Sequence, residues 1–549
     1  MQFMKKTLCA LILCAMTIPC TAFADNTATI ETADTITLFS DSVSDIQITE
    51  DEREFMEFFA SQIKERNKEI TVPDTFNISS ERFGTIYREC MGNFLKDVHP
   101  EIFYFDGSVS YNSGTLRKIT PSYSMTDEEI EEAETSISLE LEKIKGLLND
   151  SMTDTEKVLT VHDYIAAEYE YDTVLFSNPG EESRTLDTMV AKKKGVCQGY
   201  ASLFKYVMDN IGIECECVPS DECRHVWNKV RISIDGEEKK WYNIDVTADD
   251  PLIDMASNIS HKNFLVNDDE IKDLDPNLHG SWNEYKWDST TPATISDSTD
   301  FSDSVIHNVG GQMIYKDNKW YGFAAADDDN NNVLSVIDIP DNEIIPLYTP
   351  PSKFRWFVSG TSNTYYSSQI SSMVLFEDNI FFNSPDKIYV YNTKTNSADI
   401  VYNFEDENPD KKDISKTYIY GIRVRNNNLY AEYTTCPYNT LDDEGNIISA
   451  KMDDLIPVKL AGAFPCSSEI LPIEGRAIRV NLSIPDSLKN TALMRAAQYN
   501  ENNLFIGFAN PIENSDNDYL CSDDCKTIKA FIWDSSNQKP LADVSNFTF

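Results

Sequence analysis

Apolar side chains recur at helical spacing soon after the start of the chain. Between about residues 50 and 66 the large apolar side chains lie one, three or four positions apart, and they are Phe55, Phe58, Phe59 and Ile63. This spacing gathers them on one face of a helix. The pattern therefore predicts an amphipathic helix from Glu50 to about Arg66.

Further elements are predicted before residue 170. Thr126 lies three positions before Glu129, which is the spacing of a capping box, so we expect a helix to begin there and helical structure to continue through Leu148. Another helix is predicted from Thr155 to about Tyr169, and the apolar run 102–105 is typical of a strand.

The segment from Leu186 to about Val266 changes from helical to strand-like patterning. A helix is expected to open at Gly195-Val196-Cys197, because an amphipathic run follows it. Two strand-like pieces come next, at 225–232 and 240–247, and Asp235-Gly236 between them is typical of a hairpin turn. A helix followed by a hairpin predicts an α+β unit here.

Beyond about residue 305 the pattern is that of β-structure. A polar turn before an aromatic strand recurs loosely at 317–321, 378–382 and 427–430. Irregular repeats of this kind suit propeller-like blades, and stacked β-sheets are the alternative because three repeats are few for a closed propeller. The strand-rich segment from about Arg476 is expected to form a small β-sandwich.

Length and charge limit the possible partners. With 549 residues the chain is too long for one hydrophobic core, so several domains are expected. Its 91 acidic and 47 basic residues give a formal net charge of -44. Nucleic acids and anionic membranes bind basic surfaces, so neither is expected as a partner.

The first 24 residues read as a secretion signal. Lys5 and Lys6 precede a mostly apolar run that is too short to span a bilayer, and Ala22-Phe23-Ala24 fits a signal-peptidase site. Later apolar stretches are too short for a membrane helix. We therefore expect an extracellular bacterial protein, held at most to a cell surface.

Export changes the interpretation of the cysteines. Three of the 12 leave with the signal, so nine remain, and an odd number suggests one free thiol. If Cys197 is that thiol, the others are expected to form disulfides. Cys521 and Cys525 are the first candidates for a pair, and Cys223 is a candidate partner for Cys215 or Cys217.

Cys197 meets a requirement of thiol chemistry. A thiol has a pKa near about 8.5, and both a helix N-terminus and a neighbouring imidazolium stabilise its thiolate. Cys197 lies where the predicted helix opens, His225 opens the first strand of the predicted hairpin, and Asp245 lies in the second. The order thiol, imidazole and carboxylate in this context predicts a catalytic triad.

Three segments carry a resemblance to a known family. Val-Cys-Gln-Gly-Tyr-Ala at 196–201, His-Val-Trp-Asn-Lys-Val at 225–230 and Trp-Tyr-Asn-Ile-Asp-Val-Thr-Ala-Asp-Asp-Pro at 241–251 resemble the motifs of the bacterial transglutaminase-like superfamily. The resemblance covers about residues 50 to 270 and implies a papain-like α+β core. It also implies Cys197 as nucleophile, His225 as base and acid, and Asp245 as the group that orients His225. The tail, with Ala-Phe-Ile-Trp-Asp-Ser at 530–535, resembles a small β module of secreted Firmicutes proteins.

The site departs from that family at two positions. Ala248 stands where the motif usually has Trp, and Val226 where it usually has Ala after the histidine. Ala248 and Trp227 are expected to shape the substrate groove. The backbone N–H of Cys197 is the expected oxyanion donor, with Gln198 and Tyr171 as weaker candidates for the oxyanion or for positioning the substrate.

No metal or cofactor is expected, although two alternatives are open. Cys215, Cys217, Cys223 and His225 could be read as a zinc site, but exported cysteines usually pair. Residues 327–332 are rich in Asp and Asn, yet they lack the ligand spacing and the glycine turn of a calcium loop.

The expected fold is multidomain, with a papain- and transglutaminase-like α+β core followed by an all-β region. The boundaries are 1–24 for the signal, 25–48 for a disordered lead-in, 49–150 for an α+β extension, 151–287 for the catalytic domain, 288–304 for a linker, 305–475 for the blade-like part and 476–549 for the sandwich.

The leading functional hypothesis is a secreted thiol enzyme that acts on a peptide or protein substrate. An acyl-enzyme on Cys197 would be released by water, as in a cysteine peptidase or amidase, or by an amine, as in a transglutaminase. Hydrolysis is favoured, because bacterial relatives are mostly regarded as peptidases. The rival hypothesis is a binding or scaffold protein that keeps the fold without the activity.

Overall fold

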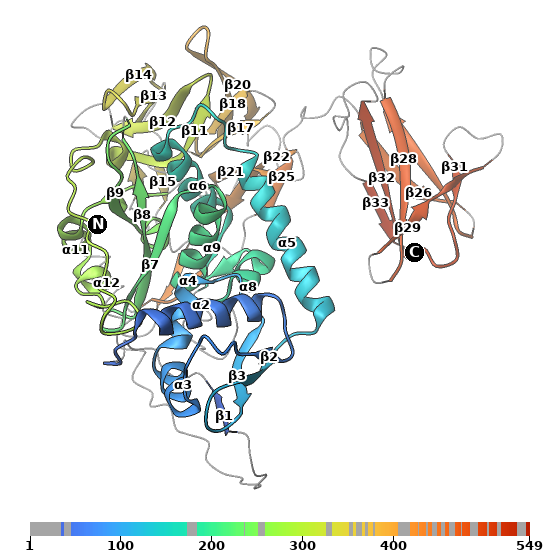
Figure 1. Ribbon diagram of the computed structural model, residues 1–549. Coiled ribbons are helices and arrows are strands. Elements are labelled where there is room, and N and C mark those ends of the chain that lie inside the picture. The colour runs from blue at the N-terminus through green and yellow to red at the C-terminus, as the bar shows by residue number, and fades with distance from the viewer. Residues whose placement is uncertain are drawn as a thin grey trace.

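The structure is a computed structural model, and the regions that it describes are interrupted by gaps (Figure 1). Up to residue 325 the described ranges are 34–37, 45–172, 184–234, 236–250 and 259–325. Beyond that point they are 332–350, 355–357, 365–367, 372–376, 379–403, 418–425, 428–434, 438–441, 447–451, 456–459, 467–473, 475–483, 492–501, 504–512, 518–534 and 545–548.

The first lobe packs helices against a small antiparallel sheet with the strand order β1-β3-β4-β2. Its elements are β1 (Asp34–Thr37), α2 (Glu50–Lys64), β2 (Ile70–Thr71), α3 (Ser80–Ile86), a π-helical turn (Tyr87–Met91), α4 (Gly92–Val98), β3 (Phe105–Tyr111) and β4 (Lys118–Tyr123). The predicted helix over 50–66 is confirmed as α2, and Phe55, Phe59 and Ile63 are fully buried. The strand expected over 102–105 is wrong for its first three residues, since β3 begins only at Phe105.

The second layer joins helices to a four-stranded antiparallel sheet with the order β10-β9-β8-β7. The helices are α5 (Asp127–Lys145), α6 (Asp154–Glu168), α8 (Leu186–Lys192) and α9 (Cys197–Asn210). The strands are β7 (Glu214–Ser220), β8 (His225–Ile232), β9 (Lys240–Ile244) and β10 (Phe264–Val266). The two predicted strands of the hairpin are thus β8 and β9, and Gly236 between them has φ +79°.

Helix ends in this layer follow sequence signals. The predicted capping box at Thr126 and Glu129 is confirmed at the start of α5, and a second capping box at Thr153 and Glu156 opens α6. Each box satisfies backbone N–H groups that a helix start leaves without an intrahelical partner. The capping box therefore fixes the residue at which helix α6 begins.

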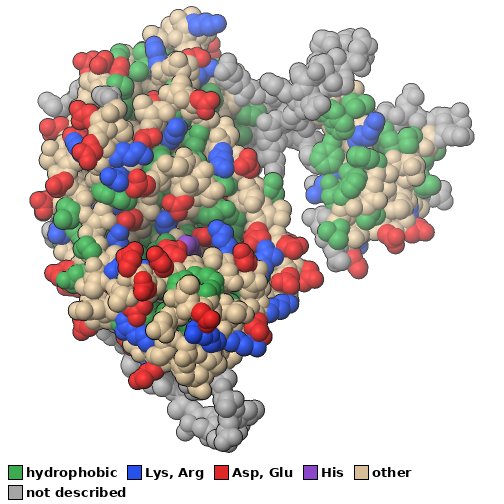
Figure 2. Space-filling view, viewed as in Figure 1, with side chains coloured by type: hydrophobic (Ala, Val, Ile, Leu, Met, Phe, Trp, Pro, Cys, Tyr) green, Lys and Arg blue, Asp and Glu red, His purple; other side chains and the backbone are tan. Residues whose placement is uncertain are grey.

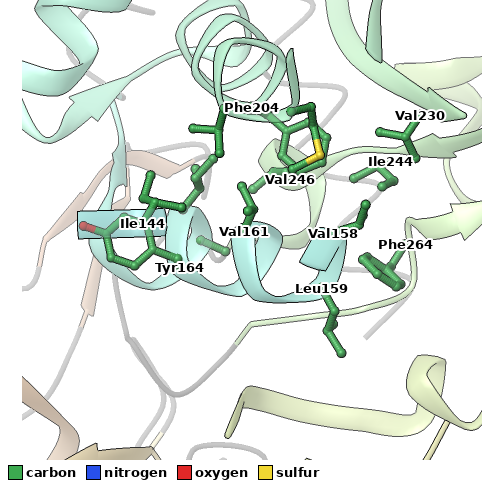
Figure 3. Packing of buried hydrophobic residues seen from close by; sticks show 14 of the residues in the cluster. Ile144, Val158, Leu159, Val161, Tyr164, Phe204, Val230, Ile244, Val246 and Phe264 are labelled. Carbon is green, nitrogen blue, oxygen red and sulfur yellow. The ribbon is translucent and has the colours of Figure 1, made fainter. Parts of the chain in front are cut away.

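The core of this layer lies between α6, α9 and the sheet. Val158 and Val161 of α6 lie near Val246, while Phe204 projects from α9 above them (Figure 3). Ile244 and its neighbours from the sheet close the other side of the same cluster. Burying side chains of this size contributes about 1.5–3 kcal/mol each, so this cluster holds α9 firmly over the sheet.

The first all-β sheet is packed directly onto this layer. It has the order β11-β12-β13-β14, and its strands are β11 (Val309–Lys316), β12 (Lys319–Ala325), β13 (Asn332–Asp338) and β14 (Glu343–Tyr348). Val309, Met313 and Trp320 belong to the same buried cluster as α6. Trp320 Nε1 also donates to Glu156 of α6 over 2.9 Å. The sheet is therefore continuous with the core that carries the helices.

Residues 288–304 contact both the first lobe and the second layer. Asp288 is fully buried and its carboxylate lies 3.4 Å from Arg53 of α2. Ser296 donates to the carbonyl of Trp241, and Asp300 accepts from Tyr242 over 2.7 Å. The segment that was expected to be a linker is thus bound to its neighbours by an ion pair and by side-chain hydrogen bonds.

Later sheets stack on the first. The sheet β17-β18-β19-β20 comprises β17 (Met373–Phe376), β18 (Asn379–Asn383), β19 (Lys387–Asn392) and β20 (Ser397–Asn403), and it shares a buried cluster with the first sheet. A second cluster joins it to the sheet β21-β22-β25, made of β21 (Tyr418–Arg425), β22 (Asn428–Thr434) and β25 (Ile456–Lys459). Two strand pairs accompany them, β15 (Arg355–Phe357) with β16 (Tyr365–Ser367) and β23 (Tyr438–Leu441) with β24 (Ile447–Lys451).

The loose sequence repeat marks the first hairpin of each of these three sheets. Asp317 and Asn318 join β11 to β12 with φ of 52° and 57°, the left-handed pair that a tight hairpin needs. The other two repeats fall at the β17–β18 and β21–β22 hairpins. In the described ranges the sheets do not close into a propeller, so the propeller-like expectation is not confirmed and stacking describes them.

The last part of the chain folds around its own small core. Two four-stranded sheets, β26-β27-β31-β30 and β29-β28-β32-β33, face each other across it. Their strands are β26 (Ser467–Pro472), β27 (Ala477–Ser483), β28 (Ala492–Tyr499), β29 (Phe505–Phe508), β30 (Asn510–Pro511), β31 (Asp518–Leu520), β32 (Thr527–Asp534) and β33 (Ser545–Thr548). The sheets form a separate lobe in Figure 1, as a small sandwich would.

The expected disulfides are not found among the described cysteines. Cys521 and Cys525 are hydrogen-bonded neighbours with free thiols, and Cys215, Cys217 and Cys223 are free as well. Cys436 and Cys466 lie outside the described residues, as do the signal, most of the lead-in and most of the Asp- and Asn-rich run at 327–332.

Two surface properties bear on the expected partners. No helix in the described ranges is long and apolar enough to cross a membrane. Acidic and basic side chains are interspersed over the face drawn in Figure 2, although the chain has a formal charge of -44.

Candidate functional site

Cys197 is the first residue of α9. The residue before it, Val196, is extended and its side chain supplies no cap to the helix. Gly199 and Tyr200 already donate to the carbonyl of Val196. The N–H of Cys197 belongs to the first turn of the helix, where the helix dipole is positive and favours an anion.

The sheet carries the other two predicted residues to this helix start. His225 is the first residue of β8, and Asp245 directly follows β9. Asp245 is thus beyond the strand in which it was expected, and its side chain caps the short helix α10 (Val246–Asp249). The cap fixes one carboxylate oxygen, because Oδ1 accepts from the N–H of Ala248 over 3.1 Å.

Cys197, His225 and Asp245 form one hydrogen-bonded row. Nε2 of His225 lies 2.6 Å from Oδ2 of Asp245, and the imidazole also hydrogen-bonds the thiol of Cys197. With Nε2 on the carboxylate, Nδ1 is the ring nitrogen left for the thiol. The backbone N–H of Val226 donates to the sulfur as a second partner.

His225 and Asp245 are buried and Cys197 is half-buried, and burial decides the electrostatics of the three groups together with their own charges. Burial opposes the charged forms of all three groups, yet the charge and hydrogen bond of Asp245 hold the pKa of His225 well above its usual range. His225 and the Val226 N–H in turn lower the pKa of the Cys197 thiol. The charge of His225, with hydrogen bonds from His225 and His279, keeps the pKa of Asp245 below its usual range. This arrangement favours a thiolate–imidazolium pair over a neutral thiol and imidazole.

The weaker predicted residues have different positions. Tyr171 lies in the short strand β5 (Glu170–Tyr171). It is close to the site because β5 pairs in parallel with β6 (Lys194–Gly195), which ends two residues before Cys197. Burial and the nearby charges of Cys197 and Asp245 raise the pKa of Tyr171. Gln198 instead directs its amide along α9, where it donates to Ser202 over 3.2 Å.

Trp227 and Ala248 were both expected to shape the groove. Trp227 is only 1% exposed, its ring stacks on His225 with 5.9 Å between centroids, and its Nε1 donates to Asn243. It therefore supports the imidazole from behind, because a side chain so buried offers no surface to a substrate. Ala248 is half-buried, and its groove role stays a prediction.

A second histidine at the site was missed. His279, at the end of α12 (Pro276–His279), has Nε2 2.8 Å from the same Asp245 oxygen that binds His225. No motif surrounds it in the sequence. One signal was present: the chain has only six histidines, and four of them lie between 162 and 279, within and just beyond the segment that carries the motifs.

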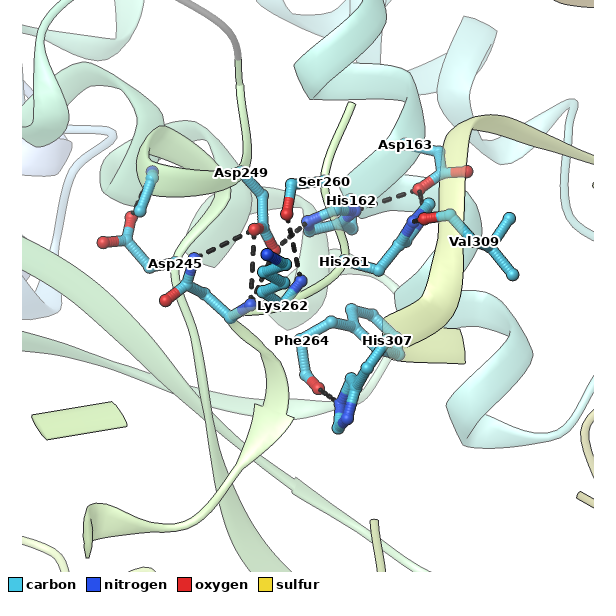
Figure 4. A network of polar contacts seen from close by, with 12 residues as sticks. His162, Asp163, Asp245, Asp249, Ser260, His261, Lys262, Phe264, His307 and Val309 are labelled. Carbon is cyan, nitrogen blue, oxygen red and sulfur yellow. Dashed lines mark hydrogen bonds and ion pairs between the residues drawn. The ribbon is translucent and has the colours of Figure 1, made fainter. Parts of the chain in front are cut away.

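A buried polar network fixes the helix that Asp245 caps (Figure 4). His162 of α6 lies between two carboxylates, with Nδ1 2.9 Å from Asp163 and Nε2 3.3 Å from Asp249 of α10. The carboxylate of Asp163 also accepts a hydrogen bond from Nε2 of His261 over 2.8 Å and another from the backbone N–H of Met313 over 2.7 Å. The network therefore ties α10 to α6 and to β11.

Both buried histidine clusters have the residue types of a metal site. The nitrogens and oxygens of His162, Asp163 and His261 lie within 4.8 Å of one another, and so do those of His225, Asp245 and His279. Neither cluster includes a cysteine. In both, hydrogen bonds between the same atoms account for the arrangement, so we treat them as hydrogen-bonded networks.

Comparison with known proteins agrees with the motifs. The family model of the transglutaminase-like superfamily matches residues 143–246. Kyphoscoliosis peptidase of Homo sapiens is 27% identical over 141 residues, which are 23% of this chain and 20% of that protein. The protein of the same name from Mus musculus is 26% identical over the same length, again 20% of its chain. The chain thus spans about a fifth of the length of these relatives. The resemblance, expected over about residues 50 to 270, is confirmed over residues 143–246.

Solved structures with partial similarity include a TGase and a putative protease from Parabacteroides distasonis. The TGase has a TM-score of 0.18 and 15% identity, with 25% of this chain and 42% of that chain covered. The putative protease has a TM-score of 0.16 and 15% identity, with coverages of 23% and 28%. The tail module resembling secreted Firmicutes proteins stays a prediction.

The His162 network predicts a pH-dependent stability. Burial opposes the charge, but the two carboxylates raise the pKa of His162 to about 9. A raised pKa in the folded state gives stability that is complete below the unfolded value near 6.5 and is lost as pH rises through about 9. We expect His162→Gln to lose about 3 kcal/mol of unfolding free energy at pH 6 and much less at pH 9, measured by urea unfolding.

His307→Gln is the matched control, because His307 is half-buried and bonds one backbone carbonyl, that of Phe264. It should lose less than His162→Gln at pH 6. A stability gap between wild type and His162→Gln that stays constant or widens from pH 6 to pH 9 would contradict a protonated His162 between the carboxylates.

Proposed function

Because residues 143–246 form a transglutaminase-like domain, we propose that this chain is a thiol enzyme that attacks peptide or amide carbonyl groups through Cys197. One observation carries the proposal: at the start of a helix the half-buried thiol of Cys197 is hydrogen-bonded to the buried His225, which is hydrogen-bonded to the buried Asp245. In this proposal His225 is the acid and base, and Asp245 orients His225 and stabilises its charged form.

The first step forms a thioester. The Cys197 thiolate attacks the carbonyl carbon of the substrate. The developing oxyanion accepts a hydrogen bond from the backbone N–H of Cys197 at the helix start. The Nδ1 proton of His225 then passes to the leaving amine as the C–N bond breaks. Asp245 keeps its negative charge throughout, which is consistent with its lowered pKa.

The second step releases the acyl group. Water or a primary amine attacks the thioester, His225 takes its proton at Nδ1, and the thiolate leaves. The name of the curated relatives, kyphoscoliosis peptidase, favours water. We therefore propose hydrolysis as the main reaction and a peptide or protein as the substrate, with transamidation as the alternative.

Ala248 bears on which substrates can approach. It follows Asp245 by three residues, and its methyl group replaces the large indole that the family motif usually has there. A smaller side chain leaves more room beside the row. The same difference is the observation that favours an inactive binding protein as the second candidate function.

The central test uses a peptide library. We expect cleaved peptides in the absence of added amine and at most a minor cross-linked fraction when a primary amine is present, both read by mass spectrometry. Cys197→Ala should abolish product formation and leave the thermal midpoint nearly unchanged, because the thiol is one small group at a helix start.

Asp245→Asn is a further variant for the same assay. It keeps the size of the side chain but removes its charge, so we expect product formation to fall at least about a hundredfold. Equal product from wild type and Cys197→Ala would contradict the proposal, and so would the absence of product from wild type with every peptide. The second outcome would favour the binding function.

We also propose that the protein is exported and acts outside the cell. The support is the pattern of the first 24 residues, with Lys5 and Lys6 before a short apolar run and a small-residue site ending at Ala24. Expression in a Gram-positive host should release a protein whose first residue is Asp25, as read by N-terminal sequencing. Full-length protein retained inside the cells would contradict export.

A further inference from the structure

A short helical turn delivers His279 to the row. Asp275 caps α12 and Pro276 occupies its first turn, so the turn begins at a defined residue. The N–H of His279 donates to the carbonyl of Asp275 over 2.9 Å. Directly after it, a Cβ at Gly280 would lie 2.2 Å from the Pro276 carbonyl oxygen, so the chain can pass this point only with glycine.

The ring of His279 is enclosed and can make one strong polar contact. The side chain is fully buried, with the ring edge-on to Trp227 at 5.1 Å and to His225 at 5.5 Å between centroids. Nε2 meets Oδ2 of Asp245, and Nδ1 has no hydrogen-bond partner in the described part of the chain. A proton on Nδ1 would be a buried, unpaired donor, so the proton belongs on Nε2.

Asp245 does not need His279 to keep its orientation. Its Oδ1 accepts the N–H of Ala248, and its own N–H donates to the carbonyl of Asn263. His225 occupies Oδ2 from the other side. His279 adds a second donor to an oxygen that already binds the imidazole, so its effect is mainly on the charge that His225 experiences.

We propose that His279 is a positioning residue of the thiol site, which donates its Nε2 proton to Oδ2 of Asp245 and thereby weakens the hold of that oxygen on the His225 proton. This inference rests on the proposed function. In each cycle His225 must give a proton to the leaving amine and take one from water. An unshared carboxylate in a buried site would retain the imidazolium and slow that transfer.

Few other titratable groups face this arrangement. Among the described residues the thiol of Cys197 faces His225 from α9, and the phenol of Tyr171 on β5 interacts electrostatically with Cys197 and Asp245. On its own strand, β8, His225 is stacked on Trp227, which carries no charge. A change at residue 279 is therefore expected to act on His225 through Asp245.

The test follows the titration of His225 by NMR of protein labelled with carbon-13 in its histidines. The chain has six histidines, and the signal of His225 is assigned by its loss in His225→Asn. His279→Phe replaces the imidazole by a slightly larger aromatic ring and removes the donor. We expect the pKa of His225 to rise by about one unit relative to wild type, because one hydrogen bond to the carboxylate is lost.

Two further variants separate this role from packing. His279→Gln can bring an amide N–H close to the position of Nε2, so the titration of His225 should return toward that of wild type. His279→Asn has a shorter reach and should behave like His279→Phe, which also provides the answer if the Phe variant does not fold. In the peptide assay, the alkaline limb of the pH–rate profile should shift to higher pH in His279→Phe and His279→Asn but not in His279→Gln.

The outcomes distinguish this inference from the proposed function. A His225 pKa that is high in wild type but unchanged in His279→Phe and His279→Asn would overturn the role of His279 and leave the thiol enzyme intact. A wild-type His225 that titrates in its ordinary range would overturn both. A rise in both variants with recovery in His279→Gln would support the inference.

Discussion

A single buried carboxylate holds the site together. Asp245 is 1% exposed, yet it keeps its charge because backbone and imidazole donors surround it: the N–H of Ala248 on one oxygen, and His225 and His279 on the other. Burying such a charge without partners would cost several kcal/mol. The residues around Asp245 supply those partners. The charged form of His225 in turn depends on the negative charge of Asp245.

The rest of the domain fixes the elements that meet at this carboxylate. The core between α6 and the sheet supports α9 and so the helix start that carries Cys197. The His162 network anchors α10, whose first turn Asp245 caps, to α6 and to β11. The first all-β sheet is part of this support, because Met313 of β11 donates directly to Asp163. Stability and site geometry thus share the same buried contacts.

The sequence was sufficient where local patterns decide the structure. Cys197 before an amphipathic run was enough to predict the thiol at a helix start, and Thr126 with Glu129 predicted the start of α5. Asp245 was expected inside a strand, because strand-like patterning continues through Val246, but its side chain caps α10 instead. Long-range contacts were harder: nothing near His279 in the sequence indicates that a turn 34 positions after Asp245 returns to it.

The β region and the cysteines show the same limit in another form. The polar turn expected at Asp317 and Asn318 is present and joins two strands of a hairpin, but a turn signal does not determine how successive sheets pack, and the propeller is not confirmed in the described ranges. The disulfides were inferred from compartment and parity, which are properties of the whole chain. The thiols of Cys215 and Cys217 are instead buried in the core, where burial raises the pKa of both.

The proposed thiolate of Cys197 depends on His225, and alkylation tests this dependence within one molecule. Iodoacetamide reacts with the thiolate form, so modification of Cys197 and of Cys223, which is also a half-buried free thiol, can be compared by peptide mass spectrometry between pH 5 and 8. We predict that Cys197 reacts fast already near pH 6, well ahead of Cys223, and that His225→Asn removes this advantage. Equal and slow modification of both cysteines at pH 6, rising together toward pH 8, would contradict the claim.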